Sequence, residues 1–342
     1  MIEILSGGGL NTVQDLGRYG YRKIGVTVAG AMDKLALAAG NLMLGNPPGS
    51  AGIEITIFPF RVRFLAGTRI ALTGADGDAR LDGEPVLPWW SLRVRKGQVL
   101  ELPVARSGSR AYLTVRGGID VPVVMNSRST DLKAKFGGFE GRSLRKGDRL
   151  ALLAVDGDRA GPAGGYGVEP PRLALGFEFG SGDEALAIRV VPAAEYELFK
   201  EAAQRHFWAM PWRITPNSNR QGFRFAGTPL LTEGLPELLS RGMVPGTLQV
   251  PPSGLPIVQM SDANPSGGYP NIGTVIEADM WRLAQAGLGD SVRFVRASVP
   301  EAIAALKAER DWLRKIEAAV ATLRARRSDL KRRERDSGTV RA

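Results

Sequence analysis

The sequence has no cysteine and only one histidine among its 342 residues. Without cysteine the chain can form neither disulfides nor thiolate-based catalytic or zinc sites. A single histidine, His206, nearly removes histidine-based metal sites and catalytic triads. We interpret His206 as a packed or surface residue rather than a catalytic base, and we predict no metal site.

Long apolar runs are also missing. No segment reaches the roughly 18 apolar residues that a membrane-spanning helix needs. The start of the chain, Met1-Ile2-Glu3-Ile4 followed by glycines, does not resemble a signal peptide. With 44% hydrophobic and 23% charged residues, the composition is that of a globular protein. We expect a soluble, cytoplasmic protein with no membrane partner.

The net charge of +10 is concentrated at one end of the chain. Residues 300–342 contain 12 Lys and Arg against 7 Asp and Glu, which gives +5. No basic stripe interleaved with aromatic residues is visible, so nucleic acid is not expected as a partner. The alternative, a nucleic-acid binder that uses this tail, would show salt-sensitive binding that truncation at Pro300 abolishes.

The 43 glycines and 22 prolines separate short strand-like runs, which favours a β-rich fold with many turns. Residues 96–102, 146–152 and 288–294 share one plan, in which a turn of glycine and polar residues leads into an alternating strand. This recurrence in both halves predicts two related β-barrels. Residues 155–172 have the composition of a linker. We therefore divide the chain into β domains at 1–160 and 161–298 and a basic helical tail at 299–342.

Besides a helix at Glu195 to His206, two segments are expected to be helical. Asp33 is placed to cap a helix that ends at Gly45-Asn46-Pro47-Pro48. Beyond Pro300, apolar residues with three-four spacing predict a second helix that docks on the protein or on a partner, with a solvated basic end past Arg324. These residues are Leu306, Leu313, Ile316, Val320, Leu323 and Leu330.

The stretch from Pro245 to Leu283 contains a polar loop, residues 261–270, between two apolar runs. Gly267 and Gly268 let the backbone approach a ligand closely, and neighbouring side chains supply donors and acceptors. A functional site is one interpretation. A plain connection between strands is the other.

Several segments together resemble the biotin-dependent carboxyltransferase family, whose members are also called allophanate hydrolase subunit 2, urea amidolyase-related protein and the C-type component of 5-oxoprolinase. The resemblance covers roughly residues 2 to 297. The segments that carry it are 9–18 (GLNTVQDLGR), 30–33 (GAMD), 72–76 (LTGAD), 115–120 (VRGGID), 127–131 (SRSTD), 215–222 (TPNSNRQG) and 244–270.

The resemblance implies a mainly β structure with two cyclophilin-like β-barrels. It also implies an obligate companion, known as allophanate hydrolase subunit 1 or as the B-type component of 5-oxoprolinase. An A-type 5-oxoprolinase component could complete the complex. The implied activity is ATP-dependent opening of 5-oxoproline to glutamate, or biotin-dependent carboxyl transfer to a urea-like substrate. This chain shows neither an ATP-binding motif nor a biotin-accepting Met-Lys-Met, so any biotin would be carried on another chain.

Both chemistries act on an amide, lactam or urea. They require donors for a developing oxyanion and a group that handles an N–H proton. For each Arg or Asp the alternative is an ion pair that braces a loop. Catalytic roles are expected for Asp262, Tyr269, Gln249 and Arg116, and substrate binding for Asp76, Arg128, Asp131, Arg220, Ser266, Gly267 and Gly268.

Two positions depart from the family pattern. Ala29 stands where the family has serine, and Asn264-Pro265-Ser266 replaces Gln-Thr-Thr. These changes bear on the substrate and on activity itself. The alternative to an enzyme component is a non-catalytic antagonist that binds a kinase-inhibitor protein homologous to the companion.

Overall fold

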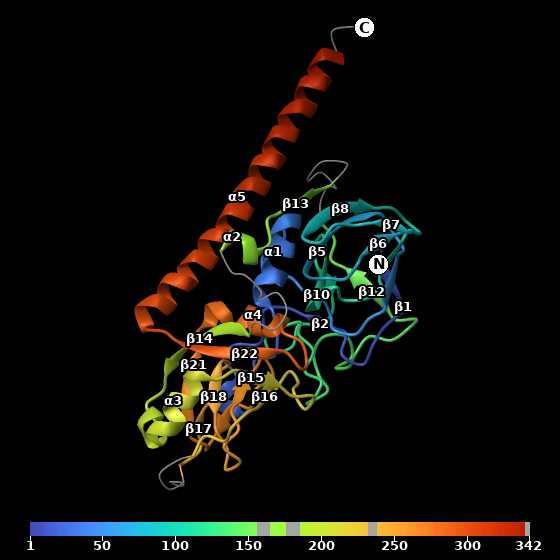
Figure 1. Ribbon diagram of the computed structural model, residues 1–342. Helices are drawn as coiled ribbons and strands as arrows, with labels where there is room; N and C mark the ends of the chain where they lie inside the picture. Colours follow the sequence, from blue (N-terminus) through green and yellow to red (C-terminus); the bar gives the residue numbers. More distant parts are fainter. Residues whose placement is uncertain (156–164, 176–184, 232–237, 339–342) are drawn as a thin grey trace.

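The computed structural model describes residues 1–155, 165–175, 185–231 and 238–338, and only the backbone within 327–338. Figure 1 shows two β-rich halves side by side and one long helix that runs across both and projects beyond them. The prediction of a mainly β fold with a C-terminal helical extension is confirmed. The divisions at residues 160 and 298 stay predictions, and most of the proposed linker lies outside the described residues.

Two sheets share one core in the N-terminal half. Their strand orders are β11-β12-β1-β4-β9-β6-β7 and β13-β8-β5-β10-β3-β2. Apolar and polar residues alternate along the strands, so one face of each sheet packs on this core. In Phe60–Phe64 the apolar residues are buried and the two arginines are exposed. The strands are β1 (Ile2–Ser6), β2 (Thr12–Gln14), β3 (Gly52–Ile55), β4 (Phe60–Phe64), β5 (Thr68–Asp76), β6 (Arg80–Leu81), β7 (Glu84–Pro85), β8 (Trp90–Val94), β9 (Val99–Leu102), β10 (Ser107–Val115), β11 (Ile119–Asp120), β12 (Arg149–Leu152) and β13 (Tyr166–Gly167).

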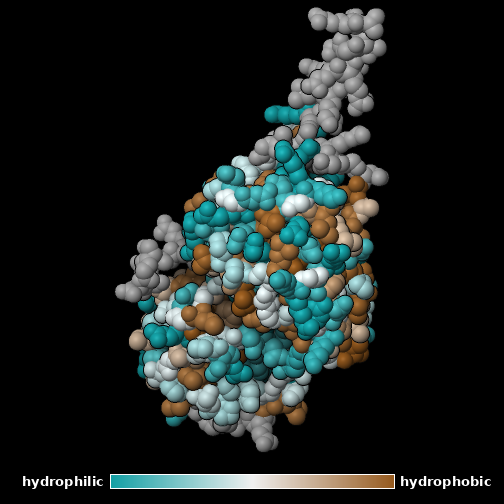
Figure 2. Space-filling model, turned by 90° about the vertical axis from the view of Figure 1, so that its right-hand side faces the viewer, coloured by the Kyte–Doolittle hydropathy of each residue, from teal (hydrophilic) through white to brown (hydrophobic). Residues whose placement is uncertain are grey.

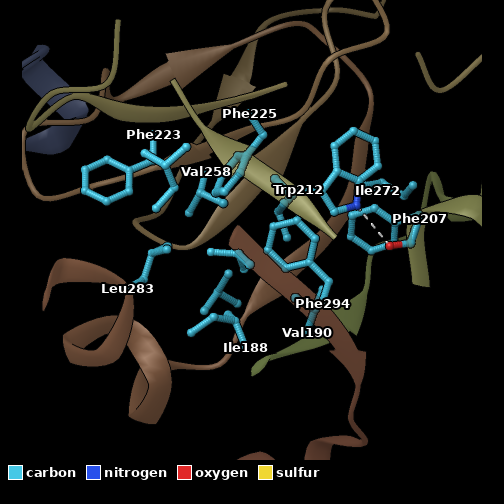
Figure 3. Packing of buried hydrophobic residues seen from close by; sticks show 14 of the residues in the cluster. Ile188, Val190, Phe207, Trp212, Phe223, Phe225, Val258, Ile272, Leu283 and Phe294 are labelled. Carbon is cyan, nitrogen blue, oxygen red and sulfur yellow. Dashed lines mark hydrogen bonds between the residues drawn. The ribbon is translucent and has the colours of Figure 1, made fainter. Parts of the chain in front are cut away.

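A closed barrel of seven strands, in the order β14-β21-β18-β19-β16-β15-β22, forms the C-terminal half. Its core is rich in aromatic side chains (Figure 3), where Phe207 stacks on Phe294 at 5.0 Å and Trp212 donates a hydrogen bond to the Phe207 carbonyl. The strands are β14 (Leu186–Pro192), β15 (Trp212–Ile214), β16 (Gly222–Ala226), β18 (Thr247–Gln249), β19 (Ile257–Gln259), β21 (Asn271–Val275) and β22 (Ser291–Arg296), with β17 (Arg241–Gly242) and β20 (Ser266–Gly267) paired outside it.

Helix α1 (Lys34–Leu44) begins and ends as the sequence predicts. Asp33 is its N-cap and accepts a hydrogen bond from the Ala36 amide at 2.8 Å. Gly45 ends the helix at a φ of 63°, a conformation that glycine adopts readily. The other helices are η1 (Arg22–Ile24), α2 (Pro171–Ala174), η2 (Tyr196–Leu198), α3 (Glu201–Ala209), η3 (Glu277–Asp279), α4 (Met280–Gln285) and α5 (Val299–Gly338).

Helix α5 packs on α1 through side chains four residues apart. Trp312, Ile316 and Val320 are buried in the same cluster as α1, and Trp312 lies edge-on to Trp89 at 5.9 Å. Leu323 is 37% exposed, so the expected apolar seam does not extend that far on this surface. Leu330 was also expected in this seam, but its side chain lies outside the described residues.

The described helices include none long and apolar enough to cross a membrane. The face drawn in Figure 2 mixes hydrophilic and hydrophobic residues over most of its area.

Candidate functional site

Arg220 lies on the loop between β15 and β16 and reaches from the C-terminal half into the N-terminal half. Its Nε and Nη2 atoms donate to the two carboxylate oxygens of Asp262, each at 2.9 Å. Nη2 also donates to the Gly30 carbonyl at 2.5 Å, and Nη1 bonds Glu54. All three charged side chains are at least nine-tenths buried. Arg220 therefore joins the two halves at a buried ionic centre.

Glu54 continues this network through the N-terminal half. It lies on β3, and its Oε2 accepts hydrogen bonds from the Met32 amide at 2.8 Å and the Tyr112 hydroxyl at 2.7 Å. The same hydroxyl accepts from the Asp33 amide at 2.8 Å. Burial and nearby carboxylates raise the pKa of Tyr112, which keeps its hydroxyl protonated. A chain of hydrogen bonds thus connects Asp262 to the start of α1.

Asp262 follows β19 and is 5% exposed. Burial raises its pKa, while the Arg220 guanidinium acts in the opposite direction, and Asp131 and Glu54 add to the increase. A buried carboxylate of this kind suits proton transfer better than an exposed one. Asp262 remains the strongest acid-base candidate of the predicted set.

Arg18, which the sequence expectation did not single out, lies close to this centre. It is fully buried, sits over the Phe136 ring at 4.5 Å, and donates to the Val124 and Ser129 carbonyls. Its Nη1 is buried and has no hydrogen-bond partner among the described residues. An unpaired guanidinium nitrogen can receive an anionic group. Position 18 belongs to the GLNTVQDLGR segment, so the family resemblance already pointed to Arg18 as a possible site residue.

Asp131 and the neighbouring loop form the other side of the seam between the halves. Asp131 accepts from the Thr27 hydroxyl at 2.7 Å. Lys133 donates to the Asn264 side chain at 3.1 Å and Arg22 to the Pro265 carbonyl at 3.4 Å. Asn264 and Pro265, two of the positions that depart from the family pattern, therefore contact the N-terminal half directly.

Gln249 and Asn271 form a second polar group on the barrel. The two residues are register partners on β18 and β21 and are 7% and 9% exposed. Gln249 Oε1 accepts from Gln259 at 2.9 Å, while Gln249 Nε2 and Asn271 Oδ1 have no hydrogen-bond partner in the described part of the chain. A side chain at Gly267 would place its Cβ 2.6 Å from Gln249 Nε2, so the Gln249 amide would have to move to accommodate it. A buried donor and a buried acceptor thus stand unpaired on neighbouring strands.

Arg116, Asp76 and Arg128 lie apart from these two groups, whereas Ser266, Gly268 and Tyr269 belong to the segment between Gly267, which lies beside Gln249, and Asn271. Arg116 donates to the Leu44 carbonyl at 2.9 Å. Leu44 is the last residue of α1, and the length of this helix places it about 16 Å from Asp33 at the other end. Asp76 lines a separate pocket, and Arg128 donates to the Val121 carbonyl. Ser266 is exposed and Tyr269 is 48% exposed, while an added Cβ at Gly268 would lie 2.9 Å from the Leu238 carbonyl.

The unpaired polar atoms of Arg18, Gln249 and Asn271 suit carboxylate and amide groups rather than a metal ion. Across the described part of the chain, no cluster of three or more His, Asp and Glu side chains could hold a metal. The unpaired Gln249 Nε2 and Asn271 Oδ1 fit a carbonyl next to an N–H, an arrangement that lactams, ureas and the ureido ring of biotin share.

Residues 24–296 match the family model "Carboxyltransferase domain, subdomain A and B", and the chain belongs to this family. It is 43% identical over 317 residues to the C-type 5-oxoprolinase component of Escherichia coli, covering 93% of this chain and 97% of that one.

Other relatives are larger. Urea amidolyase of Saccharomyces cerevisiae is 30% identical over 320 residues, which cover 91% of this chain and 17% of that protein. The crystal structure of Kluyveromyces lactis urea carboxylase superimposes with a TM-score of 0.83 at 28% identity, covering 92% of this chain and 29% of that chain. The family resemblance seen in the sequence is confirmed, and the homologues are components or parts of enzymes.

Proposed function

We propose that this chain is the C-type component of a heteromeric, ATP-dependent enzyme that processes an amide or lactam, with 5-oxoproline opened to glutamate as the favoured reaction. Near full-length similarity to the C-type 5-oxoprolinase component supports this choice over the longer urea enzymes. The observation that carries it is the unpaired Gln249–Asn271 couple, because its donor and acceptor match the C=O and N–H of a lactam.

Each polar group then has a distinct role. Gln249 Nε2 donates to the lactam oxygen as negative charge develops there, and Asn271 Oδ1 accepts the lactam N–H. When water adds to the carbonyl and the C–N bond breaks, the leaving nitrogen takes up a proton. Asp262 is the residue we assign to proton transfer, held in place by Arg220. Arg116 is assigned a structural role at the end of α1.

Cofactors and partners follow from the same proposal. The complex uses ATP, and a companion of the B type known from 5-oxoprolinase completes the site, with an A-type protein as the further component. Biotin, if the complex uses it, is carried on another chain and would supply the carboxyl group. Gln249 and Asn271 are the residues that would hold its ureido ring.

The test is reconstitution of the complex. The chain is co-purified with its companions, and ATP-dependent hydrolysis of 5-oxoproline is measured with and without a biotin carrier protein. Turnover without the carrier is the expected result. Turnover of a urea-like substrate only with the carrier would favour carboxyl transfer instead, and a stable complex that turns over no amide, lactam or urea would favour the antagonist role.

A further inference from the structure

A pocket of about 140 Å³ lies between the N-terminal half and α4, away from Gln249 and Asn271. Two tryptophans line it: Trp89, which precedes β8, and Trp281 on α4. Both indoles are more than nine-tenths buried, and Trp89 Nε1 donates to the Gly74 carbonyl at 3.1 Å. Prolines 88, 170 and 171 add further apolar wall. The pocket is thus small and mainly aromatic and aliphatic.

Two carboxylates also line this pocket. Asp33 is 1% exposed, and its oxygens each accept one hydrogen bond at 2.8 Å, from the Ala36 amide and from Gln285 Nε2. Asp76 Oδ1 accepts from the Asp78 amide at 3.0 Å. Every carboxylate oxygen has a further lone pair, so these bonds leave room for a ligand donor. Arg172, the cationic residue of the lining, is exposed.

Asp33 ends a buried network of charged groups. The hydrogen-bonded chain from Asp33 through Tyr112 to Asp262 contains the carboxylates of Asp33, Glu54 and Asp262, and the guanidiniums of Arg18, Arg110 and Arg220 act on them. Burial raises the pKa of Asp33 to about 6, so at neutral pH this carboxylate is mostly ionised. The groups that donate to it, the Ala36 amide and Gln285, are neutral, so a cation in the pocket would give Asp33 a direct ionic partner.

We propose that this pocket binds a small organic cation, a primary or quaternary ammonium, against Trp89 and Trp281 with its charge toward Asp33 and Asp76. Indole faces attract ammonium groups, and buried carboxylates add to that attraction. A pocket of this size suits a small molecule. The proposal stands independently of the lactam-opening reaction.

The experiment uses the full chain with 5-fluorotryptophan, whose fluorine resonances are assigned by single Trp→Phe variants. The probes are benzylammonium, benzyl alcohol and benzoate, which share a ring and differ in charge. Benzylammonium should shift the resonances of Trp89 and Trp281, while Trp208 and Trp212, in and near the barrel core, stay unchanged. Equal shifts with benzoate, or shifts spread over all the tryptophans, would overturn the proposal.

Two conservative variants test the carboxylates. Asp76→Asn and Asp33→Asn keep the shape, and asparagine can still cap α1. Each should weaken benzylammonium binding at least tenfold and leave benzyl alcohol binding unchanged. Asp120→Asn, an exposed aspartate on β11, is the matched control. Wild-type affinity for benzylammonium in both pocket variants would show that the site does not recognise a cation.

Discussion

Arg220 holds both carboxylate oxygens of Asp262, with two donor-acceptor distances of 2.9 Å, while its third nitrogen bonds Glu54 in the other half of the chain. Burying three charges is costly unless each is paired, and here one guanidinium serves two carboxylates. The removal of Arg220 would therefore affect more than a single ion pair.

Arg220→Met should destabilise the protein by about 3–5 kcal/mol, because it leaves Glu54 and Asp262 buried without the guanidinium that pairs with both. Urea unfolding at neutral pH measures the loss. Arg224→Met, at an exposed position on β16, is the control and should change stability by less than about 0.5 kcal/mol. Equal effects of the two substitutions would mean that Arg220 does not hold the halves together.

Gln249→Leu should lower kcat for 5-oxoproline on the order of 10²-fold in the reconstituted complex, because it removes a donor to the developing oxyanion. Asn271→Leu should act mainly on KM by removing an acceptor for the substrate N–H. Gln221→Leu is the control, since the Gln221 side chain has no hydrogen-bond partner in the described structure. A drop in kcat for Gln221→Leu as large as that for Gln249→Leu would contradict the assignment.

Glu309 on α5 makes stability depend on pH. Burial raises its pKa to about 9, reinforced by Asp33, Asp279 and Glu277, while a hydrogen bond with Trp281 acts in the opposite direction. Between pH 4.5 and 9 the folded protein keeps a proton that the unfolded chain releases. Stability should therefore fall as pH rises through this window, by up to about 1.4 kcal/mol per pH unit.

Glu309→Gln should remove this slope, and urea unfolding at about pH 5, 7 and 9 measures it. Glu317→Gln, an exposed residue of the same helix, should leave the wild-type slope intact. If the Glu309→Gln variant keeps the full slope, another group is responsible.

Trp312→Ala should destabilise the protein by about 3–5 kcal/mol, because it leaves a cavity between α5, α1 and Trp89. Ile303→Ala is the control on the same helix, since Ile303 is 63% exposed, and should cost less than about 1 kcal/mol. Thermal unfolding compares the two. Unchanged stability of Trp312→Ala would mean that α5 is not docked in solution.

Local features could be predicted from the sequence. Asp33 as a cap, Gly45 as the end of α1 and a helix after Pro300 all depend on neighbours within a few residues, where capping and turn chemistry act. Arg220 and Asp262 were also named as site candidates, and the structure brings them into contact.

Other features depend on contacts between distant segments. Glu54 lies in a short strand where an acidic residue normally faces water, yet it is fully buried because Arg220, 166 residues later, bonds it. Arg116 and Asp76 lie in segments that carry the resemblance, but α1 and the β5 strand place them away from Gln249. The spacing of residues along the sequence does not predict such long-range contacts.

The two guanidiniums at the end of α1 also bear on the tail. Arg116 and Arg324 both donate to the Leu44 carbonyl, so the last described side chains of α5 are fastened to the same helix whose first turn carries Asp33. The packed part of α5, as far as Arg324, is therefore held in place relative to α1 and to the buried network that begins at Asp33.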